Sequence, residues 1–269
     1  MSEPAQAGKT CDLRGIREAV CVHTGKITDS CLAKDCIEDL RVYLTVDSQH
    51  TLDCAASAKA RFVELLFVDV QVECVPYSSG YFTVDVTFYY RVIADATLSA
   101  GRTNTVTGLA VFSKRLVLFG GETCARIFSS KDDLTCLCKK SLQSVSLPRA
   151  IAETGDPIIL GSRVMEACGC CCQSETAPSI PEALLGCFDE PLVLTGECKR
   201  LLVTIGQFSI VRLERDTQLL IPTFDYCVPS KTCPPVGGAS TESPCDVFSQ
   251  IEFPMDAFFP GKNEPCIKP

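Results

Sequence analysis

Residues 81–92 read YFTVDVTFYYRV, and apolar side chains recur in this stretch at every second position. Successive side chains of a β-strand point to opposite faces, so a period of two predicts a strand with one buried face. Residues 68–74 (VDVQVEC) alternate in the same way, and residues 76–80 (PYSSG) join the two stretches. Because Pro and Gly favour turns, the pair predicts an antiparallel β-hairpin. The buried face of its second strand would carry Phe82, Val84, Val86, Phe88, Tyr90 and Val92.

Other apolar patterns predict further strands and little helix. Residues 63–67 alternate in the opposite phase to residues 68–74, which predicts a β-bulge at 67–68 or a strand covered on both faces. Residues 106–119 favour a long bent strand or a strand pair, with a bend at Gly108 and a stop at residues 120–121. The Ala-rich residues 51–60 favour about two to three helical turns. Further strands are predicted at 42–46 and 201–221, the latter with a turn or bulge where the phase changes, and shorter ones at 125–128 and 158–164.

Many short strands with Gly and Pro turns indicate an all-β fold, an antiparallel β-sandwich or barrel-like core. Four segments follow from the patterns: a Cys-containing arm over 1–35, a β core over 36–165, a Cys-rich loop or linker over 166–200, and further strands with a Pro- and Cys-rich tail over 201–269. The last segment either joins the core or forms a second small β domain. Its residues 237–240 (GGAS) are expected to be flexible, and the tail is expected to cover the core or reach a neighbour.

The cysteine content is unusual for a chain of this length. There are 19 cysteines among 269 residues and no tryptophan, yet a core of this size does not need disulfides to fold. Residues 1–20 lack the apolar run of about 7–15 residues that a secretory signal needs, and no stretch is long and apolar enough for a transmembrane helix. We therefore expect synthesis in the cytoplasm, where thiols stay reduced. The cysteines would then bind metal, or oxidise later, after the producing cell opens.

Two classes of function are disfavoured by the composition. Lys and Arg number 25 against 33 Asp and Glu, a net charge of −8, whereas nucleic-acid binding needs clustered positive charge. The two histidines, His23 and His50, lie in segments without a clear pattern, and the common catalytic motifs do not occur. Asp35, Glu38 and Asp39 are interpreted as a turn and strand edge. The sequence therefore predicts neither an enzyme nor a bound cofactor.

Metal binding is the alternative reading of the cysteines. Thiolates are ligands for zinc and for softer ions, and a structural zinc site takes four ligands. Such a site usually has two Cys pairs, and the sequence offers one C-x-x-C, Cys168 to Cys171, beside a separate C-x-C at 136–138. The candidate metal ligands are Cys168, Cys170, Cys171 and Cys172.

Crosslinking between molecules accounts for more of the cysteines, because they gather in the least regular segments. Cysteines on peripheral segments can reach a neighbouring subunit, and each disulfide contributes about 2–4 kcal/mol. Cys54, Cys74 and Cys124 are instead expected in or beside the core, where a free Cys acts as a small hydrophobe. The candidates for disulfide crosslinks are Cys11, Cys21, Cys31, Cys168, Cys170, Cys171, Cys172, Cys187, Cys198, Cys227, Cys233, Cys245 and Cys266.

Several longer segments resemble a family of cysteine-rich proteins from clostridia and related spore-forming Firmicutes. This family brings no catalytic residues, and its proteins are similar in character to the cysteine-rich exosporium proteins of clostridia, which self-assemble into hexagonal two-dimensional crystals. The segments are CIEDLRVYLT (36–45), VPYSSGYFTVDVTFYYRV (75–92), GLAVFSKRLVLFGGE (108–122), DPIILGSR (156–163), LLIPTFDYCVP (219–229) and PCDVFSQIEFPMDAFFP (244–260).

The resemblance implies a protein of the spore, made in the mother-cell cytoplasm and finally located at the spore surface, in the exosporium or coat. Extending it, we expect a structural protein that self-assembles through a hexameric or other cyclic unit into a lattice locked by intermolecular disulfides. Its partners would be further copies of itself and other spore-envelope proteins. The alternative function is a cytosolic thiolate-rich metal-binding protein.

Overall fold

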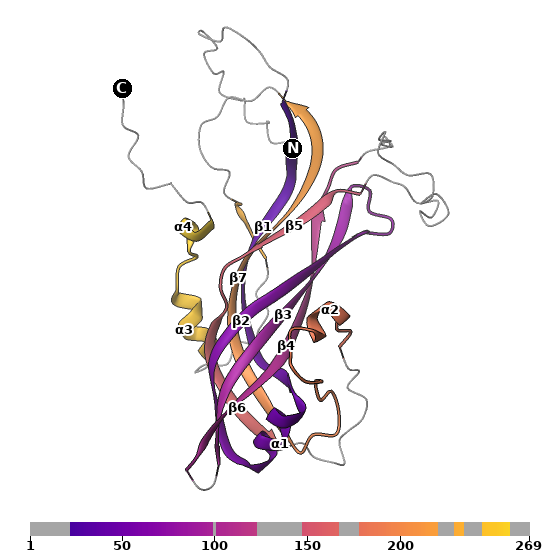
Figure 1. The fold of residues 1–269 in the computed structure, drawn as a ribbon. Helices are drawn as coiled ribbons and strands as arrows, with labels where there is room; N and C mark the ends of the chain where they lie inside the picture. Colours follow the sequence, from indigo (N-terminus) through magenta and orange to yellow (C-terminus); the bar gives the residue numbers. More distant parts are fainter. Residues whose placement is uncertain are drawn as a thin grey trace, which may run out of the picture.

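The computed structural model describes residues 22–98, 101–122, 147–166, 178–219, 229–233 and 244–258 (Figure 1). Within these residues the long strands are β1 (Val22–Leu44), β2 (Ala55–Cys74), β3 (Tyr81–Leu98), β4 (Thr103–Phe119) and β7 (Lys199–Leu219). The shorter elements are β5 (Arg149–Thr154), β6 (Ile158–Glu166), β8 (Lys231–Thr232), α1 (Val46–Cys54), α2 (Glu182–Leu185), α3 (Pro244–Gln250) and α4 (Met255–Phe258).

All the strands belong to one sheet with the order β2-β3-β4-β1-β7-β5. The strands β5 and β6 follow each other along the same edge of β7, opposite residues 209–214 and 199–206 respectively. These pairings are antiparallel, and the short β8 adds a parallel pairing to β1. The predicted all-β class is confirmed, and residues 199–219 lie in the same sheet as residues 55–119.

The predicted hairpin is confirmed as β2 and β3. Val68 lies opposite Phe88 and Cys74 lies opposite Phe82 in an antiparallel register. The even-numbered side chains predicted to be buried are buried. Tyr77 and Gly80 of the turn have positive φ angles of 62° and 79°, a region that glycine enters without steric cost. The β2–β3 register shifts between Leu65 and Phe67, so of the two predicted alternatives the structure has a bulge, just before the predicted position 67–68.

The sheet curls until its first and last strands approach, which nearly closes it into a barrel (Figure 1). At this seam the backbone N–H of Ala60 in β2 donates to Ser162 Oγ in β6 at 2.9 Å. On the opposite side, β1 and β4 pair only where Val42 to Leu44 face Ala110 to Gly108. The interior is mainly apolar and is filled from all the long strands, for example by Phe88, Val203 and Leu213.

A bulge in β1 reverses which side chains face the interior. Cys31, Ala33 and Ile37 are buried in the main core, but beyond the bulge Val42 and Leu44 take over. The register with β7 shifts between Ile37 and Leu40. Asp39 lies within this shift with φ 52°, and Asp is one of the few residues other than Gly that tolerates this conformation.

The structure differs from the predicted helix and from the predicted break in the last long strand. The helix α1 ends at Cys54, and residues 55–60, expected to be helical, begin β2. There the pairing with β3 outweighs the helix propensity of alanine. The strand β7 runs without a turn, and its apparent change of phase arises because residues 205–211 are buried on both faces.

Other predicted segments are placed as follows. The strand β4 is a single strand that ends at Phe119, just before the predicted stop. Residues 22–35 of the predicted arm form the first part of β1, and residues 158–166 form β6. The predicted strand at 125–128 and the segment 237–240 lie outside the described residues.

We predict that Gly108→Ala weakens the closure between β1 and β4. A Cβ atom at this position would lie 2.5 Å from the carbonyl oxygen of Tyr43 and 2.9 Å from Leu44 Cα, both backbone atoms. The free energy of unfolding should fall by about 1–3 kcal/mol, measured by urea denaturation without reductant.

The matched control is Gly186→Ala, where the nearest atom to the added Cβ would lie 3.6 Å away. This change should alter the free energy of unfolding by less than about 0.5 kcal/mol. Equal urea midpoints for the two variants would contradict the close approach of β1 at Gly108.

Candidate functional site

Two disulfides join β1 to the C-terminal third of the chain. Cys31 pairs with Cys233 and Cys36 pairs with Cys245, across 202 and 209 residues of sequence. Their Cα–Cα distances of 5.8 and 5.6 Å lie in the ordinary range for disulfides. Cys31 is fully buried in the main core. The two disulfides hold separate parts of the C-terminal region, β8 and the helices α3 and α4.

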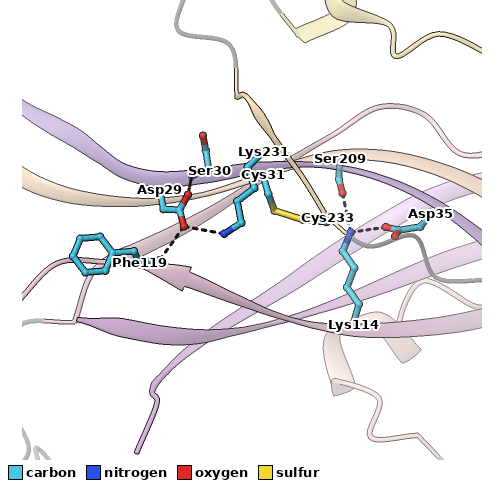
Figure 2. The surroundings of a disulfide bond; sticks show 9 residues. All are labelled: Asp29, Ser30, Cys31, Asp35, Lys114, Phe119, Ser209, Lys231 and Cys233. Carbon is cyan, nitrogen blue, oxygen red and sulfur yellow. Dashed lines mark hydrogen bonds and ion pairs between the residues drawn. A yellow bond between two sulfur atoms is a disulfide. The ribbon is translucent and has the colours of Figure 1, made fainter. Parts of the chain in front are cut away.

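The Cys31–Cys233 disulfide lies where β4 diverges from β1 (Figure 2). There β8 takes a place beside β1, and the backbone N–H of Cys233 donates to the Leu32 carbonyl at 2.7 Å. Asp29 Oδ2 accepts hydrogen bonds from the Phe119 backbone N–H and from Lys231 Nζ, both at 3.0 Å. The carboxylate of Asp29 therefore links β1 both to the end of β4 and to β8.

A buried ion pair spans the same gap deeper in the barrel. Lys114 Nζ in β4 donates to Asp35 Oδ2 in β1 and, at 3.1 Å, to Ser209 Oγ in β7 (Figure 2). The side chains of Lys114 and Asp35 are only 4% and 1% exposed. Burial lowers the pKa of Lys114, and the charge of Asp35 opposes that shift. Removing either partner would leave the other charge unpaired in an apolar interior.

Tyr90 and Gln207 continue the polar interior beside this pair. The Tyr90 hydroxyl donates to Gln207 Oε1 at 3.2 Å, and Gln207 Nε2 donates to the carbonyls of Gly155 and Phe208, both at 2.8 Å. Burial and then the negative charge of Asp35 raise the pKa of Tyr90 well above its ordinary value. Every buried polar side-chain atom of the described residues has a hydrogen-bond partner. These groups therefore join the strands to one another, and their hydrogen-bonding capacity is used within the protein.

Residues 244–258, here called the C-terminal strap, cover the outer face of β1 and β7. Phe248 is 1% exposed and its ring lies 4.7 Å from that of Phe208, centroid to centroid. Lys34 Nζ donates to the carbonyls of Ser249 and Ile251 at 2.7 and 2.8 Å. Full burial of a Phe side chain contributes about 1.5–3 kcal/mol. The Cys36–Cys245 disulfide then fixes the strap covalently to β1.

Four cysteines of the described residues are free and exposed, namely Cys54, Cys74, Cys187 and Cys198. The sequence predicts Cys54 and Cys74 in or beside the core, as buried small hydrophobes. This prediction is wrong, because both side chains are exposed. Cys54 ends α1 and Cys74 ends β2, so both lie at the end of an element, where the side chain is exposed. Cys198 is near Cys54, because the backbone N–H of Lys199 donates to Asp53 Oδ1 at 3.0 Å.

The crosslinking candidates therefore fall into three groups. Cys31, Cys233 and Cys245 form disulfides within the chain, so in this structure they do not bond a neighbour. Cys187 and Cys198 are exposed thiols, as crosslinking requires. Cys11, Cys21, Cys168, Cys170, Cys171, Cys172, Cys227 and Cys266 lie outside the described residues.

Sequence reasoning missed Cys36 and Lys114, and it misassigned Asp35 to a turn or strand edge. The signal for Cys36 was available, because it starts an apolar strand pattern and lies in opposite phase to the inward Ile37. For Lys114 and Asp35 no comparable signal exists, since Lys114 lies between Ser113 and Arg115, and Asp35 follows Lys34, as is typical of a surface.

No group of three or more His, Cys, Asp or Glu side chains in the described part of the chain could hold a metal ion. The four candidate metal ligands at 168–172 lie outside that part.

A cleft of about 720 Å³ follows the seam between β2 and β6, lined by residues 61–65 and 156–159. No helix among the described residues is long and apolar enough to cross a membrane. Comparisons with protein-family models, curated proteins and solved structures found no match.

We predict that Lys114→Met costs about 3–5 kcal/mol of folding free energy, because it leaves the Asp35 carboxylate buried without its cation. The double variant Lys114→Met with Asp35→Leu should recover most of this loss, since an apolar pair of similar volume replaces the ion pair. Urea denaturation of both variants measures the difference.

The control is Arg115→Met. Arg115 follows Lys114 in β4, and its exposed side chain forms an ion pair with Asp85 of β3. The urea midpoint of this variant should stay near that of the unmodified protein, because exposed ion pairs contribute little. A Lys114→Met midpoint equal to the control would show that Lys114 is not buried against Asp35.

Proposed function

We propose that this protein is a structural, non-enzymatic component of the outer layer of a bacterial spore, the exosporium or coat. It self-assembles into an ordered oligomeric lattice, through a hexameric or other cyclic unit, that intermolecular disulfides stabilise. The observation that supports this most is the division of the described cysteines. Four lie in disulfides within the chain, and four are exposed free thiols on the surface of the same barrel.

The placement of the exposed thiols suits crosslinks in more than one direction. Cys54 immediately precedes β2 and Cys74 ends it, so the two thiols are separated by the length of a 20-residue strand, about 65 Å when extended. Cys198 lies near the first of these ends, and Cys187 follows α2. Thiols at well-separated places let one copy bond to several neighbours, as a layer requires and a dimer does not.

The chemistry of the cysteines is compatible with the compartment that the resemblance implies. Synthesis in a reducing mother-cell cytoplasm would keep all the cysteines as thiols while the barrel folds. Oxidation after lysis of that cell would then form the two internal disulfides and the crosslinks at the spore surface. Further copies of the chain, and other spore-envelope proteins with exposed cysteines, are the partners this chemistry would recruit.

A thiolate metal-binding protein is the second candidate, supported by four cysteines within the five residues 168–172. Protein purified under reductant should then contain stoichiometric zinc or a softer ion. That metal would be lost when Cys168, Cys170, Cys171 and Cys172 are changed to Ser.

We predict that oxidised protein forms ordered sheets, tubes or rings in negative-stain electron microscopy. On non-reducing SDS gels it should give a ladder that reductant collapses to a single band. A clean monomer under oxidising conditions would contradict the proposed function, and the metal content of the same sample would then test the alternative.

The quadruple variant Cys54→Ser, Cys74→Ser, Cys187→Ser, Cys198→Ser should shorten this ladder while keeping the same circular dichroism and the two internal disulfides. The matched control is Thr51→Ser, which leaves all four thiols in place and should keep the ladder unchanged. A full ladder from the quadruple variant would show that these four thiols form no crosslinks.

A further inference from the structure

We propose that Lys114 and Asp35 condense into an intramolecular isopeptide bond, an amide that joins β4 to β1 covalently inside the barrel. The bond forms between Lys114 Nζ and Asp35 Cγ, and one water molecule is released. The buried ion pair is the state from which this bond forms, and the unfolding free energies predicted for Lys114→Met refer to that state. The inference concerns the folded chain by itself and does not depend on the proposed function.

The two groups are held in contact by strands that do not pair with each other at this point. Asp35 lies opposite Gln207 of β7 and Lys114 lies opposite Val86 of β3, so each backbone is fixed from the side away from the gap. Across the gap, Lys114 Nζ donates to Asp35 Oδ2 (Figure 2). A nitrogen in hydrogen-bond contact with a carboxylate oxygen lies about 3–3.5 Å from the carboxyl carbon, the separation of reacting atoms in a near-attack arrangement. Reactants held in this way reach effective concentrations of about 10⁵–10⁸ M, which replaces the activation that amide formation in solution needs.

The surroundings favour the uncharged groups from which an amide is made. The side chains of Lys114 and Asp35 are almost fully buried, and the centre of the Phe88 ring lies 5.4 Å from Lys114 Nζ. Burial lowers the pKa of Lys114, although the charge of Asp35 opposes that shift. Keeping two charges out of water is costly, and the amide removes both of them. A site that excludes water also protects the product from hydrolysis.

The step balances without any further reactant. The Lys114 ammonium gives one proton to the Asp35 carboxylate along their hydrogen bond, which leaves an amine and a carboxylic acid. The amine lone pair attacks Cγ, so the Nζ–Cγ bond forms and the carbonyl electron pair moves onto oxygen. Ser209 Oγ takes a second proton from the nitrogen and passes its own proton to the departing hydroxyl. The Cγ–O bond then breaks, the carbonyl forms again and water leaves, with no atom oxidised or reduced.

Ser209 is placed for this proton relay by the β1–β7 register. It lies opposite Ala33, two residues from Asp35 along the same inward face of β1. Its side chain is fully buried, and its Oγ accepts a hydrogen bond from Lys114 Nζ at 3.1 Å. A hydroxyl can both accept and donate a hydrogen bond, so Ser209 serves the nitrogen and the leaving oxygen in turn.

A second pair of Lys and Asp in the same region provides an internal control (Figure 2). Lys231 Nζ donates to Asp29 Oδ2 at 3.0 Å, but these side chains are 48% and 22% exposed. Water stabilises both charged groups there, and an ammonium group has no lone pair with which to attack. The same two residue types should therefore condense inside the barrel and remain an ion pair at its surface.

The test is mass spectrometry of the full-length folded protein. After reduction and alkylation of the cysteines, the intact mass should be lower than that of the sequence by one water molecule. Trypsin should release residues 35–41 and 103–115 joined as one branched peptide, because it does not cleave after an amidated Lys114. Fragmentation should place the link between Lys114 and Asp35, whereas the peptides that contain Asp29 and Lys231 should be unlinked.

Only unlinked peptides over 35–41 and 103–114, from protein whose Cys31–Cys233 disulfide had formed before reduction, would overturn the inference. A loss of one water molecule located at other residues, including Asp29 and Lys231, would overturn it as well. The crosslinked ladder on non-reducing gels is a separate measurement. Failure of this inference and failure of the proposed function are therefore told apart.

Two variants distinguish the relay from a merely structural role of Ser209. Ser209→Ala leaves both reacting groups in place and should slow formation of the branched peptide, followed in time from the start of refolding, by about a hundredfold. Ser209→Thr restores a hydroxyl and should restore most of the rate. The matched control, Lys231→Met, should leave the rate unchanged. A Ser209→Ala rate equal to that of the unmodified protein would overturn the assignment of the relay to Ser209.

Discussion

The gap between β1 and β4 is the constraint on which the rest of this structure depends. The two strands pair only at Val42–Leu44, and beyond that point the barrel wall would be open. The Cys31–Cys233 disulfide holds β8 beside β1 at this opening, and the buried pair of Lys114 and Asp35 joins β4 to β1 across it. β8 supplies backbone partners to the freed edge of β1 at Cys31 and Leu32, which a purely apolar filling of the gap could not do.

The sequence predicts the part of the fold that local patterns determine. The alternation in residues 68–92 and the turn at 76–80 were sufficient for the β2–β3 hairpin, its buried face and its bulge. Of the helix expected at 51–60, residues 51–54 are helical in α1, whereas residues 55–60 form strand because strand pairing, a tertiary effect, outweighs alanine propensity. Asp35 and Lys114 could not be found, since only the assembled barrel shows that two distant charges meet inside it. Disulfide partners separated by about two hundred residues likewise cannot be derived from one sequence.

The two classes of cysteine have different physical roles. Those bonded within the chain close the barrel gap and hold the strap, so their loss would act on folding. The exposed thiols of the described residues contribute little to the core and are available for chemistry between molecules. This division explains how a chain long enough to fold without disulfides can still carry many cysteines.

The most direct test of this account is a disulfide map of freshly oxidised monomer, with free thiols alkylated before digestion without reductant. The account predicts Cys31 linked to Cys233, Cys36 linked to Cys245, and alkylated Cys54, Cys74, Cys187 and Cys198. Alkylated Cys31, or a bond from Cys31 to one of the exposed cysteines, would contradict the closure of the barrel by this disulfide.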